Sequence, residues 1–339
     1  MRPLFRHDPP PPLPVPAVLA FSSALFRSEA LREVGRVDPG ARAVGAAVSP
    51  MLPEAFALRS PRPFAEVARA IASSAVFTRH VQPLERVEEV ADLAAISAAL
   101  RREREATRPA RVDLVGLPRA LSRRVLRESD PGAAPAPGAL LSALVAHGRL
   151  YLGASRIEDA PSAWPAGDPG YPTEPISRAA SKLREALGHL DRPLEPGLSA
   201  LDLGAAPGGF TSVLLERGSR VLAIDPAPLA PRVAGAANLE FIRDHAERVT
   251  LERIPPLDLI TCDAVLAPSE TAALVVRFAG RLSPGGRAIV TLKLRPSPPA
   301  DEQLAGAAAL FAPALELERL RHLHANRCEV TAFLRRPGG

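Results

Sequence analysis

The stretch LDLGAAPGGFTSVLLERG, residues 201–218, decides the fold of the C-terminal half of the chain. An apolar run leads into a turn that contains Gly204, Gly208 and Gly209, and an amphipathic run follows. A strand, a glycine-rich turn and a helix in this order are typical of the first unit of a doubly wound α/β sheet. Such sheets bind their ligands at the carboxyl ends of the strands, so we expect a ligand at this turn.

Strand-like and helix-like runs alternate on both sides of this stretch. The strand-like runs are apolar without a polar alternate, which is typical of a mostly parallel sheet covered on both faces. The fold class is therefore α/β, with a Rossmann-like doubly wound domain. We expect helices at 177–190, 209–218, 270–282 and 301–311, and strands at 199–204, 220–225, 239–243, 257–263, 286–294, 314–320 and 328–334. Ser177 is the expected N-cap of the first helix.

Proline divides the chain into parts. It makes up 38 of 339 residues, about twice its usual share of ~5%, and it gathers at 9–16, 130–138 and 164–175. We expect an N-terminal α+β region at 1–155, a proline-rich connector at 156–176 and the α/β domain at 177–339. The N-terminal runs predict a first core strand within 17–26, helices at 64–74 and 89–105, and strands at 110–116 and 148–155.

Charge and cysteine content narrow the class of protein. The net charge is only +5, but nine arginines lie between Arg101 and Arg127 against three acids, an excess that could attract phosphates. A solvated helical face is the alternative for this segment. No run approaches the roughly 18 apolar residues of a membrane span, so we expect no membrane partner. Cys262 and Cys328 are too few for a disulfide framework or a metal site. This indicates a reducing cytoplasm and no metal, and we expect both thiols to be buried.

Three positions suggest the ligand of the turn. The glycines do not form GxGxxG, which makes a dinucleotide the poorer candidate. The N–H groups that open the helix at Gly209 suit a carboxylate. Asp225, 21 residues after Gly204, can accept both hydroxyls of a ribose, and Asp244 could reach an adenine amine. A ligand with a carboxylate, a ribose and an adenine but no pyrophosphate is S-adenosylmethionine.

The lysines point to the chemistry. Of 42 basic residues only Lys182 and Lys293 are lysine. Lysine can lose its proton when crowded or buried and arginine effectively cannot, so each lysine in this arginine-rich chain calls for a reason. Lys293 and Asp263 end strands on the ligand side of the sheet. Glu329 lies in an apolar strand, where an unpaired carboxylate is costly. We expect these four side chains to meet over the methyl donor.

At this point the sequence resembles a known family. ISRAASKLREAL, LDLGAAPGGFT, TCDAV, VTLKL and RCEVTAFLRR are similar to the motifs of FtsJ/RrmJ-type ribose 2'-O-methyltransferases, which carry a Lys-Asp-Lys-Glu tetrad. The similarity covers about residues 175–336 and is greatest to the RlmM group, whose members carry a THUMP domain and methylate a cytidine ribose of large-subunit (23S) ribosomal RNA. The resemblance implies a THUMP-like, RNA-binding N-terminal region and an RNA 2'-O-methyltransferase that uses S-adenosylmethionine. We expect a cytoplasmic monomer.

The resemblance assigns the site residues in two groups. The catalytic tetrad is Lys182, Asp263, Lys293 and Glu329, with Lys293 as the base or as the group that holds the nucleophilic oxygen. The expected cofactor residues are Asp202, Gly204, Ala206, Pro207, Gly208, Gly209, Phe210, Asp225, Asp244 and Asp263. The basic segment adds Arg119, Arg123 and Arg124 as RNA-binding residues.

Other functions remain open at this stage. Methylation of an exocyclic amine would favour an NPPY-like run where this chain has CDAVLAPS, and cytosine-C5 methylation would need a nucleophilic cysteine. A non-catalytic RNA-binding or ribosome-assembly protein could keep the same fold, because fold does not determine function. A methyltransferase acting on a substrate other than RNA is the third possibility.

Overall fold

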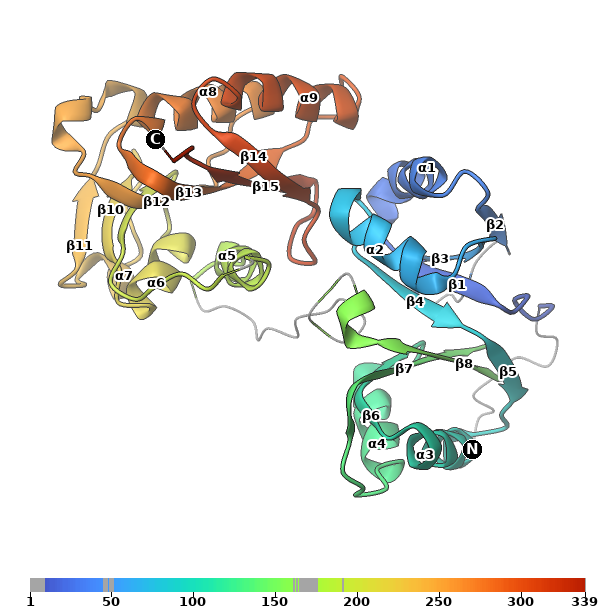
Figure 1. Cartoon of the computed structure of the whole chain (residues 1–339). Coiled ribbons are helices and arrows are strands. Elements are labelled where there is room, and N and C mark those ends of the chain that lie inside the picture. Colours follow the sequence, from blue (N-terminus) through green and yellow to red (C-terminus); the bar gives the residue numbers. More distant parts are fainter. Residues whose placement is uncertain are drawn as a thin grey trace. The chain divides into compact units, whose positions relative to one another are not determined.

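The structure is a computed structural model of the chain that describes residues 10–44, 48, 52–160, 162, 164, 176–190 and 192–338. It divides into two compact units, Met1–Pro169 and Gly170–Gly339 (Figure 1). The expected connector at 156–176 lies largely outside the described residues. No helix of the described residues is both long enough and apolar enough to cross a membrane.

The first unit begins with a four-stranded antiparallel sheet and two helices. The order of its strands is β2-β3-β1-β4, and its elements are β1 (Ala17–Phe21), α1 (Arg27–Val37), β2 (Arg42–Val44), β3 (Ala55–Arg59), α2 (Phe64–Ser74) and β4 (His80–Leu84). Every residue of β1 is buried because this strand lies between β3 and β4. The apolar run at 17–26 is therefore a core strand, as expected, followed by a helix. The βαββαβ order is that of ferredoxin-like folds.

A second sheet follows in the same unit. Its strand order is β5-β8-β7-β6, and its elements are β5 (Arg86–Glu89), α3 (Leu93–Thr107), β6 (Pro109–Val115), α4 (Arg119–Glu128), β7 (Ala136–Ala146) and β8 (Arg149–Arg156). Asp92 caps α3, its carboxylate accepting a hydrogen bond from the Ala95 N–H at 2.8 Å. Apolar residues of α3, α4, β7 and β8 form one core cluster. The α+β character expected for the N-terminal region is present in both sheets.

A buried ion network joins the two sheets of this unit. The Asp113 carboxylate accepts hydrogen bonds from Arg111 Nε at 2.7 Å and Nη2 at 2.8 Å, and it lies 3.2 Å from His80 Nε2. Burial alone would raise the pKa of Asp113, but His80 and Arg111 lower it to about 2. Arg111 also donates to the carbonyls of Ser162 and Trp164. This arginine of the basic segment is therefore a structural residue.

The second unit contains a seven-stranded sheet of order β11-β10-β9-β12-β13-β15-β14. Its strands are β9 (Ser199–Leu203), β10 (Arg220–Ile224), β11 (Leu239–Ile242), β12 (Leu257–Cys262), β13 (Leu282–Lys293), β14 (Glu316–Arg321) and β15 (Glu329–Arg335). Strands β9–β13 pair in parallel, and β15 is antiparallel to both β13 and β14. The mostly parallel α/β fold is confirmed, and its order reverses beside β9, where such sheets bind ligands.

Helices cover both faces of this sheet (Figure 1). One face carries α5 (Ala179–Gly188), α6 (Gly209–Glu216) and the short α7 (Pro231–Ala234), and the other carries α8 (Pro268–Ala279) and α9 (Ala300–Phe311). The first helix begins two residues later than expected. Arg178 occupies the N-cap position and Ser177 makes no capping hydrogen bond, so the expectation for Ser177 was wrong.

Candidate active site

Four charged side chains meet at the carboxyl ends of the central strands. Lys182 Nζ lies 3.0 Å from Glu329 Oε1 and 3.2 Å from Asp263 Oδ1. Lys293 Nζ lies 3.5 Å from Asp263 Oδ1 and donates to the Asp263 carbonyl at 2.9 Å. Different elements supply the four residues: α5 carries Lys182, Asp263 follows β12, Lys293 ends β13 and Glu329 begins β15. The structure thus brings the expected tetrad together.

The two lysines differ in what surrounds them. The Lys182 side chain is only 6% exposed and its ammonium contacts two carboxylates. The Lys293 side chain is 18% exposed, the most of the four, and contacts one carboxylate. Lys182 is therefore enclosed by its partners, whereas Lys293 is the cation that can face a bound molecule.

Glu329 is held as a charged group. Burial by itself would raise the pKa of its carboxyl, but the Lys182 ammonium, the Arg327 N–H and Lys293 together lower it. Its Oε1 contacts Lys182 while its Oε2 accepts a hydrogen bond from the Arg327 N–H. The carboxylate therefore contributes to the site as a fixed negative charge.

The glycine turn fits a ligand that approaches the backbone closely. Gly204 and Gly208 have φ angles of +70° and +111°, a region that favours glycine. A Cβ on Gly209 would lie 2.1 Å from Ser177 Oγ and 3.0 Å from Ala179 Cβ. Gly209 thus lets the start of α6 pack against the start of α5, the helix that carries Lys182.

A pocket of about 310 Å³ connects the turn with the tetrad. It is lined by Ser177, Arg178, Ala179, Lys182, Gly204, Ala205, Ala206, Pro207, Gly209, Phe210, Asp263, Val265, Lys293 and Glu329. Five of the expected cofactor residues of the turn and all four tetrad residues are therefore on one surface. Gly208, Asp202, Asp225 and Asp244 are not among the lining residues.

Asp202 supports the turn from within the core. Its carboxylate is fully buried and accepts hydrogen bonds from Thr211 Oγ1 at 2.6 Å and Thr261 Oγ1 at 2.9 Å. Burial raises the pKa of Asp202 to about 7, although the two threonine hydroxyls oppose this shift. Its contacts tie β9 to α6 and β12, so its position suits support of the glycine turn better than contact with a ligand.

The two other acids lie after β10 and β11. Asp225 is half-buried, and its carboxylate accepts hydrogen bonds from the N–H groups of Ala206 at 3.0 Å and Ala227 at 2.7 Å. It therefore holds the glycine turn in place. Asp244 is half-buried and accepts from the His245 N–H at 2.7 Å.

Several residues of this site were missed from the sequence. Arg178 lines the pocket and is exposed, and Val265 lines it beside Asp263. Buried Glu185, on α5, accepts hydrogen bonds from the N–H groups of His324 and Ala325 in the loop before Glu329. The sequence around Glu185 does not predict this contact, because His324 lies 139 residues further along the chain.

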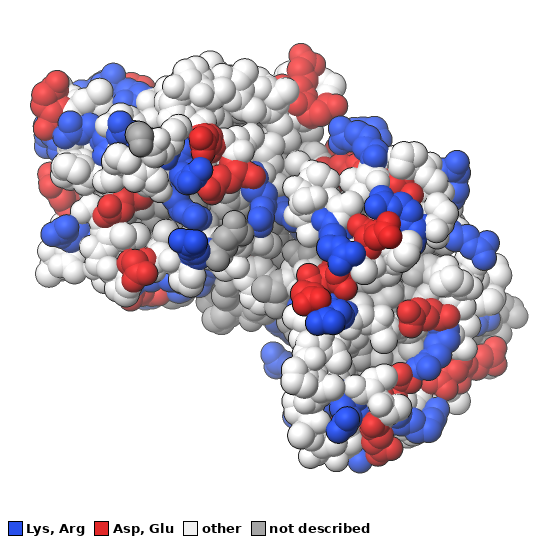
Figure 2. Space-filling model, in the orientation of Figure 1, with Lys and Arg blue, Asp and Glu red and all other residues white. Residues whose placement is uncertain are grey.

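The expected RNA-binding arginines lie on α4 in the first unit. Arg119, Arg123 and Arg124 are exposed, and Arg124 pairs with Glu128 at 2.6 Å. Other arginines of the segment also have partners: Arg102 pairs with Glu88 and Arg104 with Asp130. Acidic and basic side chains are correspondingly intermixed over the lower part of Figure 2.

The two cysteines differ in exposure. Cys262 is buried in β12, where burial raises the pKa of its thiol to about 12. Cys328 is exposed, which corrects the expectation that both thiols are buried. It lies just before β15. In the described part of the chain, no group of three or more His, Cys, Asp or Glu side chains is placed to hold a metal ion.

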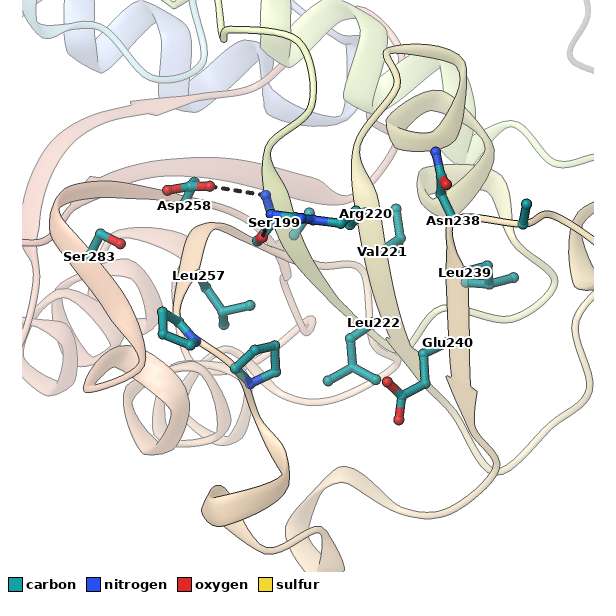
Figure 3. Close-up of a pocket in the computed structure, with 14 residues that line it drawn as sticks. Ser199, Arg220, Val221, Leu222, Asn238, Leu239, Glu240, Leu257, Asp258 and Ser283 are labelled. Atoms are coloured by element: carbon teal, nitrogen blue, oxygen red, sulfur yellow. Dashed lines mark hydrogen bonds between the residues drawn. The ribbon is translucent and has the colours of Figure 1, made fainter.

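A larger hollow of about 680 Å³ lies at the opposite ends of the strands from the tetrad (Figure 3). It is formed by the amino ends of β9–β12, where Asp258 accepts a hydrogen bond from the Ser199 N–H at 3.0 Å. Ligands of α/β sheets bind at the carboxyl ends of the strands, where the tetrad also lies. Size alone therefore does not make this hollow the functional site.

Comparisons with known proteins favour the smaller pocket, the one that contains the tetrad, as the functional site. Residues 175–337 match the family model of the FtsJ-like methyltransferases. The C-terminal half of the chain is thus similar to the FtsJ-like methyltransferases. The match includes the glycine turn and all four residues of the tetrad.

Two curated relatives share a name. The chain is 37% identical over 153 residues to ribosomal RNA large subunit methyltransferase M of Azotobacter vinelandii, covering 43% of this chain and 42% of the relative. It is 36% identical over 196 residues to the protein of that name from Methylococcus capsulatus, covering 54% of each. The chain thus spans about half the length of the curated relatives it matches.

One solved structure aligns over most of the chain. TrmN from Thermus thermophilus covers 95% of this chain and 99% of its own, at 16% identity and a TM-score of 0.39.

Proposed function

We propose that the protein is an S-adenosylmethionine-dependent methyltransferase that methylates a ribose 2'-hydroxyl of RNA, a cytidine of large-subunit ribosomal RNA. The observation that carries the proposal is the convergence of Lys182, Asp263, Lys293 and Glu329 beside the glycine turn. The name shared by the curated relatives supports large-subunit ribosomal RNA as the substrate. We propose that the protein acts in the cytoplasm as a monomer.

The residues at the turn fit S-adenosylmethionine. The N–H groups of Gly209 and Phe210 open α6, where a helix has no internal acceptors and attracts a carboxylate. Ser177 Oγ is buried beside Gly209 without a hydrogen-bond partner among the described residues. Asp225 and Asp244 would hold the ribose and the adenine. When bound, the cofactor supplies a methyl group on a sulfonium, which is activated toward nucleophilic attack.

Lys293 would act on the attacking hydroxyl. A ribose hydroxyl is a weak nucleophile until its proton is removed or shared, and its oxygen must be held in line with the methyl group. Lys293 is the tetrad cation open to the pocket, and its Nζ is fixed by the Asp263 carbonyl and carboxylate. We assign it to hold the 2'-oxygen and to take or share its proton.

The other three residues would position Lys293. Lys182 lies between Asp263 and Glu329 and prevents these two carboxylates from repelling each other. The carboxylates in turn satisfy the buried ammonium of Lys182, which would be costly to leave unpaired. The arrangement gives Asp263 a defined orientation toward Lys293.

The first unit would supply RNA affinity. Arg119, Arg123 and Arg124 are exposed on α4 and would contact phosphates. We propose residues 1–155 as the RNA-binding region, THUMP-like in its second sheet, and residues 177–339 as the methyltransferase domain.

The test is methyl transfer to unmodified RNA. Large-subunit ribosomal RNA transcribed in vitro is incubated with the protein and labelled S-adenosylmethionine, digested to nucleosides and analysed. We expect a single labelled product, 2'-O-methylcytidine. Label on a base would contradict 2'-hydroxyl chemistry, and RNA binding without any label would favour a non-catalytic RNA-binding protein.

A further inference from the structure

An exposed apolar side chain stands at the tetrad pocket. Val265 is 78% exposed, the largest value among the exposed large hydrophobic residues of the described chain. It lines the same pocket as Lys182, Asp263, Lys293 and Glu329. A single exposed apolar residue on a protein surface needs no explanation. One placed among the charged groups of a candidate active site does, because it can pack against what enters the pocket.

The backbone around Val265 is fixed at both ends. The Asp263 N–H donates to the Leu203 carbonyl at 3.2 Å, and the Ala267 N–H donates to Glu270 Oε2 at 2.8 Å. Ala264 packs so closely on Gly204 that a Cβ on this glycine would lie 2.7 Å from its Cα. Val265 is thus held on a short bridge between β12 and α8.

The surroundings of Val265 are basic. Arg178 lines the same pocket and is exposed, and exposed Arg327 lies next to the tetrad because its N–H donates to Glu329. Neither arginine has a carboxylate within ion-pairing distance among the described residues. An apolar side chain beside exposed cations suits a molecule with flat apolar faces and negative charges, which describes a nucleotide within an RNA strand.

We propose that Val265 is an apolar contact for the target nucleoside of the RNA, and that Arg178 and Arg327 take the phosphates that flank it. This inference rests on the proposed function and names how its substrate is held. Enzymes that act on a single nucleotide place it between apolar or aromatic side chains when it leaves its stack. Val265 would serve as one such wall, while the turn at 204–210 serves the cofactor.

The contact is tested by Val265→Ser, with Val265→Ile as the conservative variant. Leu310→Ser is the matched control, because Leu310 on α9 is also apolar and 41% exposed but does not line the pocket. Initial rates are measured against the concentration of in vitro transcribed large-subunit ribosomal RNA. Binding of the same RNA is measured by filter retention and that of S-adenosylhomocysteine by calorimetry.

We expect Val265→Ser to raise KM and Kd for the RNA about tenfold, the effect of losing roughly half of the free energy gained by burying a valine. Its kcat should stay within about twofold of the parent, and Val265→Ile and Leu310→Ser should behave like the parent. Unchanged RNA parameters in Val265→Ser would overturn the inference. So would a loss confined to cofactor affinity, which would assign Val265 to the cofactor.

The proposed function and this inference fail in different ways. Absence of methyl transfer by the parent protein would contradict the proposed function. Filter retention needs no turnover, so it tests the Val265 contact in that case as well. Methyl transfer by the parent together with parent-like binding and kinetics of Val265→Ser would contradict the inference alone.

Discussion

Glu329 Oε1 lies 3.0 Å from Lys182 Nζ, although the residue directly opposite Glu329 across the β13–β15 pair is Lys293. The ion pair of this carboxylate is instead with the lysine on α5, 147 residues earlier in the chain. This pairing neutralises Lys182 and leaves Lys293 with Asp263 as its contact. The different roles proposed for the two lysines follow from this relationship.

Glu329→Gln should weaken catalysis without removing the fold. Glutamine keeps the shape but loses the charge that holds Lys182, so we expect methyl transfer to fall at least about tenfold. The contribution to stability should also depend on pH. Since Lys182 lowers the pKa of Glu329 in the fold, the wild-type advantage should be present at pH 7 and disappear as the pH falls below the usual range of glutamate. Urea unfolding of both proteins at pH 7 and pH 3.5 measures this; an equal difference at both values would contradict it.

Asp202→Asn should give the opposite pH dependence. Because burial raises the pKa of Asp202 to about 7, the folded state binds a proton that the unfolded state releases above about pH 4. Wild-type stability should thus fall relative to the asparagine variant between pH 5 and pH 7, by up to about 3 kcal/mol. Hydrogen exchange of β9 at the two pH values measures this difference. No change between them would show that Asp202 is ionised in the fold.

Asp225→Ala should weaken binding of S-adenosylhomocysteine by roughly 1–3 kcal/mol, the scale of hydrogen bonds to a charged group. The variant loses the proposed ribose contact and the hydrogen bond to the Ala206 N–H of the turn. Asp258→Ala is the matched control, since Asp258 also accepts from a backbone N–H but lies at the opposite edge of the sheet. Calorimetry should show a loss for Asp225→Ala alone; equal affinities would make the ribose assignment wrong.

Replacing Arg119, Arg123 and Arg124 together by glutamine should flatten the salt dependence of RNA binding, because each phosphate contact removed lowers the slope by about 0.7–0.9. Arg124 already pairs with Glu128, so we expect less than three full contacts to be lost. Cofactor affinity should not change. Arg217→Gln with Arg253→Gln in the second unit, both exposed, is the control. A triple variant with the parental slope would indicate that this segment is a solvated helical face that does not bind RNA.

The sequence predicts the second unit better than the first. Around 201–218 each strand is a short apolar run and each helix is amphipathic, so local pattern and fold agree. The tetrad could be predicted because strand ends of a parallel sheet share one edge and because lysine is rare in this chain. The contacts of Glu185 and Arg111 with distant backbone groups could not be predicted, since tertiary packing brings these groups near.

Exposure was the least predictable property. Cys328 directly precedes Glu329 and Val265 lies two residues after Asp263, yet both are exposed because each lies outside a strand. The arginine excess at 101–127 also indicated more unpaired positive charge than the structure shows. Acids outside the segment, such as Glu88 and Glu128, pair with its arginines. Charge counted along a sequence does not include partners from neighbouring elements.

The most direct test of the account is single-turnover methyl transfer by Lys293→Arg. Arginine keeps the positive charge, but its guanidinium stays protonated and places its donors differently, so it cannot share a proton with the ribose hydroxyl. Arg287→Lys, at the other end of the β13–β15 pairing, is the matched control. We expect Lys293→Arg to lose at least about a hundredfold in rate, within the usual range of a general acid–base group. It should fold normally and bind S-adenosylhomocysteine like the parent. Methyl transfer by Lys293→Arg at the parental rate would contradict the assignment of Lys293 as the group that acts on the ribose hydroxyl.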